Sequence, residues 1–423
     1  MSAVSSPPDG GLRRTILPNG LTVLSEMVPG VRSVAFGAWV RAASVHEARE
    51  RMGVSHLLEH MVFKGTPTRS AHQIALALET LGGSLDAYTS REHTAYQARA
   101  LDAHVETAAD VIGDLMFRPL LRAADLKTER KVVLEEISTV EDTPDDLVFE
   151  LHNEAMWGAH PYGYQILGTR ETVSALGVPE LRELHTRAYN PPQIVVACAG
   201  NVQHDALLEV LERTGWNSVP RGDERPMRSP PVAAAVPGVR HVEREGAQTH
   251  IVFGSPTVAY GDPRRYAVAL VDTILGGGMS SRLFQRVRED LGLAYDVHAF
   301  QSFHPDAGMH GVYVGTAPEN AREAAQAVRD ELAKLAADSL TEEELASGKR
   351  QLAGSVTLSL ESVNSRMHRA ASSALYDEPY RTLDETLGLI DAITAEQVAA
   401  VCRAFYDPAA QTVLSLGPEP AIP

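Results

Sequence analysis

The sequence predicts an α+β protein made of two duplicated domains, each an antiparallel-rich sheet with helices packed on one face. Three pairs of segments recur 217 positions apart: 34–37 with 251–254, 189–191 with 406–408, and Gly200 with Gly417 at the ends of apolar strands. Three independent pairs at one spacing are hard to obtain by chance. In the first copy short strands also alternate unevenly with long helices, which is typical of an antiparallel sheet covered by helices.

The domain boundaries follow from this repeat and from composition. Five prolines and several charges crowd together between residues 216 and 240, as they do in exposed linkers. We therefore predict a first domain over 1–216, a linker over 217–240 and a second domain over 241–423. Each copy has the usual size of a domain.

Each element of the first copy has its own basis in the sequence. Asn19 and Gly20 form a preferred hairpin turn, so they join strands at 15–17 and 21–25. Patterns of period two predict a strand over 33–41 and a hairpin that pairs 84–90 with 94–101. Apolar positions at helical spacing predict helices around 56–60 and over 71–81, 103–117, 123–140, 145–157 and 179–188, and an apolar run predicts a closing strand over 193–199.

Composition excludes several classes of protein. The net charge of −17 disfavours binding to nucleic acid or to anionic membranes, and there is no run of eighteen apolar residues to span a bilayer. Residues 1–10 lack the basic and apolar regions of a secretory signal, so we expect a cytoplasmic protein. Two cysteines, Cys198 and Cys402, are too few for a disulfide framework and are expected in the core.

Residues 56–60 read His-Leu-Leu-Glu-His. On a helix His56, Glu59 and His60 share one face, so two imidazoles and a carboxylate converge on one point. Zinc hydrolases use this inverted-zincin string, in which the histidines bind the metal and the glutamate acts as general base. The alternative is a solvated helix face with unrelated histidines. The apolar residues around the polar face favour a buried cluster, which needs a ligand or a partner.

A catalytic zinc ion takes a third protein ligand. The helix predicted over 123–140 carries Glu129 and Glu136 two turns apart on one face, and Glu135 must point elsewhere. From the residues alone Glu136 is a candidate ligand, and the alternative is that these are ordinary surface glutamates.

The stretch 53–66 resembles the active-site helix of the pitrilysin/insulinase family of zinc peptidases, in its processing-peptidase branch. In that family a ligand glutamate follows the second histidine by about 75 residues, and here Glu136 follows His60 by 76. The resemblance implies Zn²⁺ bound by His56, His60 and Glu136, with Glu59 as general base and Glu129 supporting the site from behind the ligands. It also implies a fold of two α+β domains.

Residues 82–96 resemble the family's edge strand, which pairs with an extended peptide substrate. The resemblance implies that the segment of Asp86, Ala87, Tyr88 and Thr89 binds substrate by β-augmentation, in which the backbone supplies the hydrogen bonds. Without the family an ordinary hairpin would be preferred. Relatives usually carry Asn where this chain has Asp86, and an ionised Asp cannot donate a hydrogen bond. This departure leaves the role of position 86 open.

Residues 280–295 resemble the family's Arg/Tyr segment. The resemblance implies that Arg288 and Tyr295 contact substrate and stabilise the tetrahedral intermediate, a role that their hydrogen-bond donors suit. The alternative is a helix-surface arginine and a half-buried strand tyrosine. Because long single-chain relatives contain two such halves, we expect a homodimer, or a heterodimer with a related subunit.

The second copy has no equivalent of the metal motif, because the positions 217 residues after His56, Glu59 and His60 are Thr273, Gly276 and Gly277. The sequence therefore predicts a zinc metalloendopeptidase that cleaves peptides or unfolded segments, with chemistry in the first copy. The main alternative is a non-catalytic core or partner subunit of a processing-peptidase-like heterodimer. A third is a peptidase that works only beside a distinct inactive subunit.

Overall fold

The structure is a computed structural model that describes residues 11–222, 225, 227–232 and 235–422. The expectation of no leader in residues 1–10, and the linker positions 223–224, 226 and 233–234, lie outside the described residues. The chain forms two compact units, which are not consecutive halves of the sequence. The first unit contains ranges 1–137, 164–229 and 359–382, and the second contains 138–163, 230–358 and 383–423.

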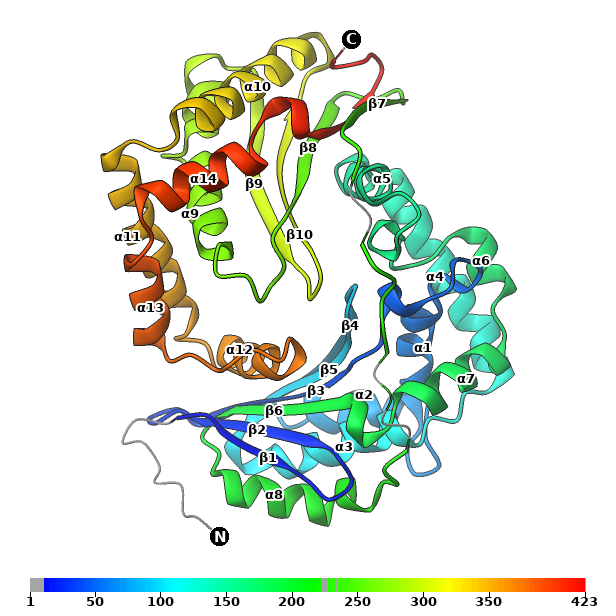
Figure 1. The fold of residues 1–423 in the computed structure, drawn as a ribbon. Coiled ribbons are helices and arrows are strands. Elements are labelled where there is room, and N and C mark those ends of the chain that lie inside the picture. Colours follow the sequence, from blue (N-terminus) through cyan, green and yellow to red (C-terminus); the bar gives the residue numbers. More distant parts are fainter. Residues whose placement is uncertain (1–10, 223–224, 226, 233–234, 423) are drawn as a thin grey trace. The chain divides into compact units, whose positions relative to one another are not determined.

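The first unit is built on a six-stranded sheet (Figure 1) with the order β1-β2-β6-β3-β5-β4. Its strands are β1 (Arg13–Ile16), β2 (Thr22–Met27), β3 (Ser33–Val40), β4 (Ser84–Thr89), β5 (Thr94–Leu101) and β6 (Ile194–Gly200). All neighbouring strands are antiparallel except β2 and β6. The predicted hairpin is confirmed: β1 pairs with β2, and the Asn19 side chain accepts a hydrogen bond from the Leu21 N–H across the turn.

Most helices of the first unit pack on one face of this sheet. They are α1 (Val54–Val62), α2 (Ala71–Glu79), α3 (Val105–Phe117), the start of α4 (Ala123–Asp142), α6 (Arg170–Ala175), α7 (Val178–Ala188) and α8 (His204–Arg213). Their apolar sides form the main core with Val34, Phe36 and Val196 of the sheet. Of these helices, α6 and α8 were not predicted.

The second unit repeats this plan with a five-stranded sheet of order β7-β11-β8-β10-β9. Its strands are β7 (Gly238–Glu243), β8 (Thr249–Thr257), β9 (Ala294–Phe303), β10 (Gly308–Thr316) and β11 (Thr412–Gly417). Its helices include α9 (Arg265–Gly276), α10 (Ala321–Asp338), α11 (Glu342–Ser359), α13 (Leu383–Asp391) and α14 (Ala395–Phe405). The predicted α+β class with two similar halves is confirmed.

One helix in each unit comes from the other copy of the repeat. Helix α12 (Val363–Leu375) packs against the second face of the six-stranded sheet, on Trp39 and Val195. Helix α5 (Pro144–Trp157) covers the second face of the five-stranded sheet, through Val148 against Leu414. The prediction of helices on one face omitted these two, although strand β6, which is buried at every position, requires cover on both faces.

The glycine at the end of each echoed strand segment makes room for the helix on the second face. A Cβ atom on Gly254 would lie 2.5 Å from the His152 ring of α5, and one on Gly37 would lie 2.6 Å from the Trp39 ring and 3.2 Å from Met367 Sδ of α12. The two glycines, 217 positions apart, therefore have a shared structural reason. Among the described residues no helix is both long and apolar enough to cross a membrane.

Candidate metal centre and its surroundings

Helix α1 starts at an unusual cap that fixes its position. Gly53 precedes the helix with φ +88°, in the left-handed region that favours glycine. The Glu47 carboxylate accepts hydrogen bonds from the N–H groups of Gly53 and Ser55, each at 2.8 Å. Burial raises the pKa of Glu47, while these N–H groups favour its charged form. Glu47 was not predicted from the sequence, although a carboxylate shortly before a helix start is a known signal for such a cap.

The same end of α1 is held by Leu167 and Gly168. A Cβ atom on Gly53 would lie 2.5 Å from the Leu167 carbonyl oxygen, and one on Gly168 would lie 2.4 Å from the Met52 carbonyl oxygen. Both positions therefore require glycine. These contacts fix the first turn of α1, which carries His56, and so help to orient both histidines.

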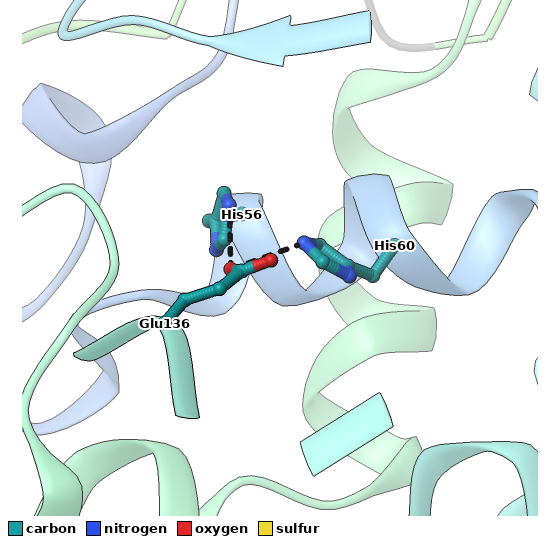
Figure 2. Close-up of side chains that lie close together, drawn as sticks. All are labelled: His56, His60 and Glu136. Atoms are coloured by element: carbon teal, nitrogen blue, oxygen red, sulfur yellow. Dashed lines mark ion pairs between the residues drawn. The ribbon is translucent and has the colours of Figure 1, made fainter. Parts of the chain in front are cut away.

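Three predicted side chains meet beside α1 (Figure 2). The Nε2 atoms of His56 and His60 lie 3.7 Å and 3.5 Å from Oε2 of Glu136, which comes from α4. The ligand atoms of the three side chains all lie within 4.8 Å of one another. Within the described part of the chain this is the single group of three or more such side chains that could hold a metal ion.

The donor set fits a zinc ion. Tetrahedral zinc with bonds of about 2.0–2.1 Å places its ligand atoms roughly 3.4 Å apart, close to the two spacings found here. Burial, helped by the neighbouring His60, lowers the pKa of His56 to about 3, so its ring is neutral and can offer a lone pair. The Glu136 Oε2 atom, turned toward both rings, is buried without a hydrogen-bond partner, as expected of an atom that binds a cation.

Glu129 lies behind this group. Its Oε2 atom is 3.3 Å from Nδ1 of His60, and its Oε1 atom is 2.9 Å from Nζ of Lys64. A carboxylate on Nδ1 orients a histidine so that Nε2 points to a metal, which matches the supporting position predicted for Glu129. Lys64 was not predicted; it neutralises a carboxylate that is only 7% exposed.

Glu59 lies on the same face of α1 and touches the edge strand of the sheet. Its Oε2 atom accepts a hydrogen bond of 2.6 Å from the Thr89 hydroxyl of β4. Burial raises the pKa of Glu59, while the Thr89 hydroxyl opposes that rise. A carboxylate with a raised pKa is a better proton acceptor near neutral pH than an ordinary surface glutamate.

Strand β4 is the last strand of its sheet, so one of its edges has no strand partner among the described residues. Side chains alternate across the strand. Ala87 packs on the main core and Thr89 meets Glu59, whereas Tyr88 lies on the opposite face against α12 and Asp86 is exposed. The four residues predicted to bind substrate are thus divided between the two faces.

Arg288 and Tyr295 meet each other in the second unit. Arg288 lies on a π-helix over Phe284–Asp290, a rare element that often marks functional positions. Its Nη1 atom donates to the Tyr295 carbonyl oxygen at 3.0 Å, and its guanidinium lies 4.4 Å from the centre of the Tyr295 ring. Tyr295 is 77% exposed, so it is not the half-buried tyrosine of the alternative.

Comparison with known proteins agrees with this geometry. Residues 22–170 match the insulinase family, also called peptidase family M16, and residues 175–352 match the domain described as the peptidase M16 inactive domain. The chain is 38% identical to the "Uncharacterized zinc protease YmxG" of Bacillus subtilis, over 93% of this chain and 96% of that one. The chain belongs to peptidase family M16. An uncharacterized zinc protease of Mycobacterium tuberculosis is another relative, 39% identical over 92% of this chain and 90% of its own length.

Two solved structures share the fold. A Pseudomonas fluorescens structure described as a peptidase M16 inactive domain matches with a TM-score of 0.90 at 22% identity, over 98% of this chain and 99% of that one. A protease from Helicobacter pylori matches with a TM-score of 0.89 at 19% identity, over 97% of this chain and all of its own. At these identities the likeness shows the fold alone.

Proposed function

We propose that this M16 family member is a zinc-dependent endopeptidase that hydrolyses peptides or unfolded segments bound as an extended strand. One observation carries the proposal: His56, His60 and Glu136 converge while Glu59 stands on the same helix face. Two imidazole nitrogens and one carboxylate leave room for a fourth ligand, as in catalytic rather than structural zinc sites.

The chain's own residues supply the proton transfers. A bound zinc ion would contribute Lewis-acid charge that activates water and polarises the scissile carbonyl. Glu59 accepts the proton of the attacking water and donates it to the leaving amine. Glu129 keeps the His60 ring in place by accepting a hydrogen bond from its Nδ1–H group, and Lys64 keeps Glu129 in place.

The free edge of β4 supports an extended substrate. The Ser90 N–H donates to the His93 carbonyl at the end of the hairpin. Because pairs alternate along an antiparallel ladder, the backbone groups of Ala87 and Thr89 point away from β5, toward the free edge. A peptide that pairs there would be bound mainly through hydrogen bonds to its backbone, so we expect weak preferences for particular substrate side chains. Asp86 is exposed on this strand and would favour basic residues nearby.

The predicted role of Arg288 and Tyr295 as donors to the developing oxyanion belongs to the same proposal. We propose a homodimer as the working form, with a heterodimer as the alternative. Sedimentation of the purified protein measures the oligomeric state. The Arg288→Lys and Tyr295→Phe variants test the donor role through kcat. Loss of kcat with zinc content unchanged supports the donor role.

The decisive experiment compares wild type with Glu59→Gln on an unstructured peptide library, with and without a zinc chelator. The variant should keep zinc and lose about 10²–10⁴-fold in kcat, the usual contribution of a general base. Chelation should abolish wild-type cleavage, and added zinc should restore it. Wild-type turnover by the variant would remove Glu59 from the mechanism.

One observation favours the second candidate, a non-catalytic partner subunit: residues 175–352 match a domain described as inactive. That match includes Thr273, Gly276 and Gly277, which stand in the second copy in place of the metal motif. The zinc content decides between the two. A zinc-to-protein ratio near zero after gentle purification, not raised by dialysis against zinc, would favour the partner subunit.

A further inference from the structure

Thr89 is the residue in which the edge strand and the general base meet. We infer that Thr89 is a positioning residue for Glu59, and that it couples the base to peptide pairing on β4. The inference rests on the proposed function, because it assigns Glu59 the task of moving the proton. Nothing in the geometry of the metal ligands requires a hydroxyl at this position, so its contact with Glu59 needs a reason of its own.

The contact between the two side chains is short and restricts Glu59. The distance from Thr89 Oγ1 to Glu59 Oε2 is 2.6 Å, in the range of strong hydrogen bonds to a charged oxygen. A glutamate side chain otherwise has several rotamers, whereas β-branched threonine has a stiff χ1. The hydroxyl therefore holds one carboxylate oxygen and leaves the other to face the water that it must deprotonate.

The backbone of the same residue lies where a peptide would pair. The N–H and C=O groups of Thr89 point to the free edge of β4, by the alternation described above. A substrate strand that forms hydrogen bonds there would fix the Thr89 backbone, and through its side chain the base. Binding of an extended peptide would thus sharpen the position of Glu59.

The opposite face of the strand is braced, which keeps Thr89 from turning. The Tyr88 hydroxyl accepts from Trp39 Nε1 and lies 3.3 Å from His93 Nε2. The Tyr88 ring stacks on His368 of α12, with the centroids 6.2 Å apart. Since neighbouring side chains point to opposite faces, a fixed Tyr88 places Thr89 toward α1.

Steady-state kinetics on one extended peptide test the coupling. Thr89→Val keeps the shape and strand preference but loses the donor, so we expect kcat to fall at least tenfold while KM changes less than threefold. Thr89→Ser restores the donor and should return kcat to within threefold of wild type. Thr94→Val is the control for loss of a neighbouring hydroxyl: the Thr94 hydroxyl donates to the Ala42 carbonyl and also lies 3.4 Å from Thr89 Oγ1, so we expect a smaller fall of kcat than with Thr89→Val. A drop of kcat with Thr94→Val as large as that with Thr89→Val, or no rescue by serine, would overturn the inference.

Thermal unfolding of the metal-free protein gives a second readout, independent of turnover. Thr89→Val should lower Tm by about 2 °C or more in the wild-type background, because it leaves Glu59 buried without its donor. In the Glu59→Ala background the same substitution should change Tm by less than half as much. Equal changes of Tm in the two backgrounds would show that the Thr89 hydroxyl does not stabilise Glu59. A wild type that cleaves no peptide would instead overturn the proposed function, while the melting cycle would still report the contact.

Discussion

Helices α1 and α9 occupy the same place in the two copies of the repeat, yet only α1 carries a metal-binding face. Position 59 on α1 holds a glutamate that meets β4 through Thr89. The position 217 residues later is Gly276, where a Cβ atom would lie 2.2 Å from the Ala299 backbone nitrogen of β9. In the second copy the strand occupies the space that a side chain would need.

The difference shows which extra contacts are needed when a helix presents a carboxylate to the edge strand. An edge strand packed directly on its helix, as β9 is on α9, buries backbone and needs no polar partner. An edge strand held off by a carboxylate, as β4 is, requires a hydroxyl to satisfy that carboxylate and a brace behind it. The two copies therefore share a framework but differ at one equivalent position, which is Glu59 in the first copy and Gly276 in the second.

The largest effect should come from removing the ligand that α4 contributes. Glu136→Ala should lower the zinc affinity by more than the roughly 10–100-fold that loss of a supporting residue causes. The reason is that a site with three protein ligands loses one of them. Equilibrium dialysis against a competing chelator measures the affinity, with exposed Glu135→Ala as the control on the same helix. Unchanged zinc affinity would mean that another residue is the third ligand.

A smaller effect is expected behind the ligands. Glu129→Gln removes the charge that orients His60 and pairs with Lys64, so zinc affinity should fall roughly 10–100-fold. The same dialysis measures it, alongside Glu135→Gln. If zinc affinity stayed at the wild-type value, the contact between Glu129 and His60 would be only structural.

In the second copy the expected effect is on stability and not on zinc. Gly276→Ala puts a Cβ atom against the β9 backbone and should cost about 1–3 kcal/mol in the free energy of unfolding, as overpacking does. Gly278→Ala is the matched control, since a Cβ atom there meets nothing within 4 Å. Denaturant unfolding measures both; equal stabilities would show that β9 can move aside.

The smallest effect concerns pH and the helix α5. Burial lowers the pKa of His152 to about 4, although its hydrogen bond to the Thr412 carbonyl opposes that fall. Below pH ~6.5 His152 becomes protonated in the unfolded chain but stays neutral in the folded protein, so the free energy of unfolding falls as the pH drops toward 4. His152→Gln should remove about 1 kcal/mol of the loss between pH 7 and pH 5.5, measured by denaturant unfolding at both values. A pH dependence equal to wild type would contradict this.

Local patterns predicted the elements of the first copy well. The hairpin at Asn19 and the helix of His56 and His60 follow from rules that act over a few residues. Glu136 lies close to both rings, as the family resemblance implied; helical spacing alone made it a candidate on the same face as Glu129.

What the sequence could not predict depends on contacts far apart along the chain. Periodicity shows that 363–375 is helical and apolar on one side, but it cannot say which sheet that side covers. Likewise no motif connects Thr89 to Glu59 or Glu47 to the N–H of Gly53, because each contact depends on how segments pack after folding.

The exchange of α5 and α12 means that the chain is interlocked with itself. Cutting it within 217–240 would leave two pieces that each still hold a helix seated on the other piece's sheet. Neither piece alone could shield both sides of its strands. The second copy is therefore needed to complete the first unit, whatever part its own residues take in catalysis.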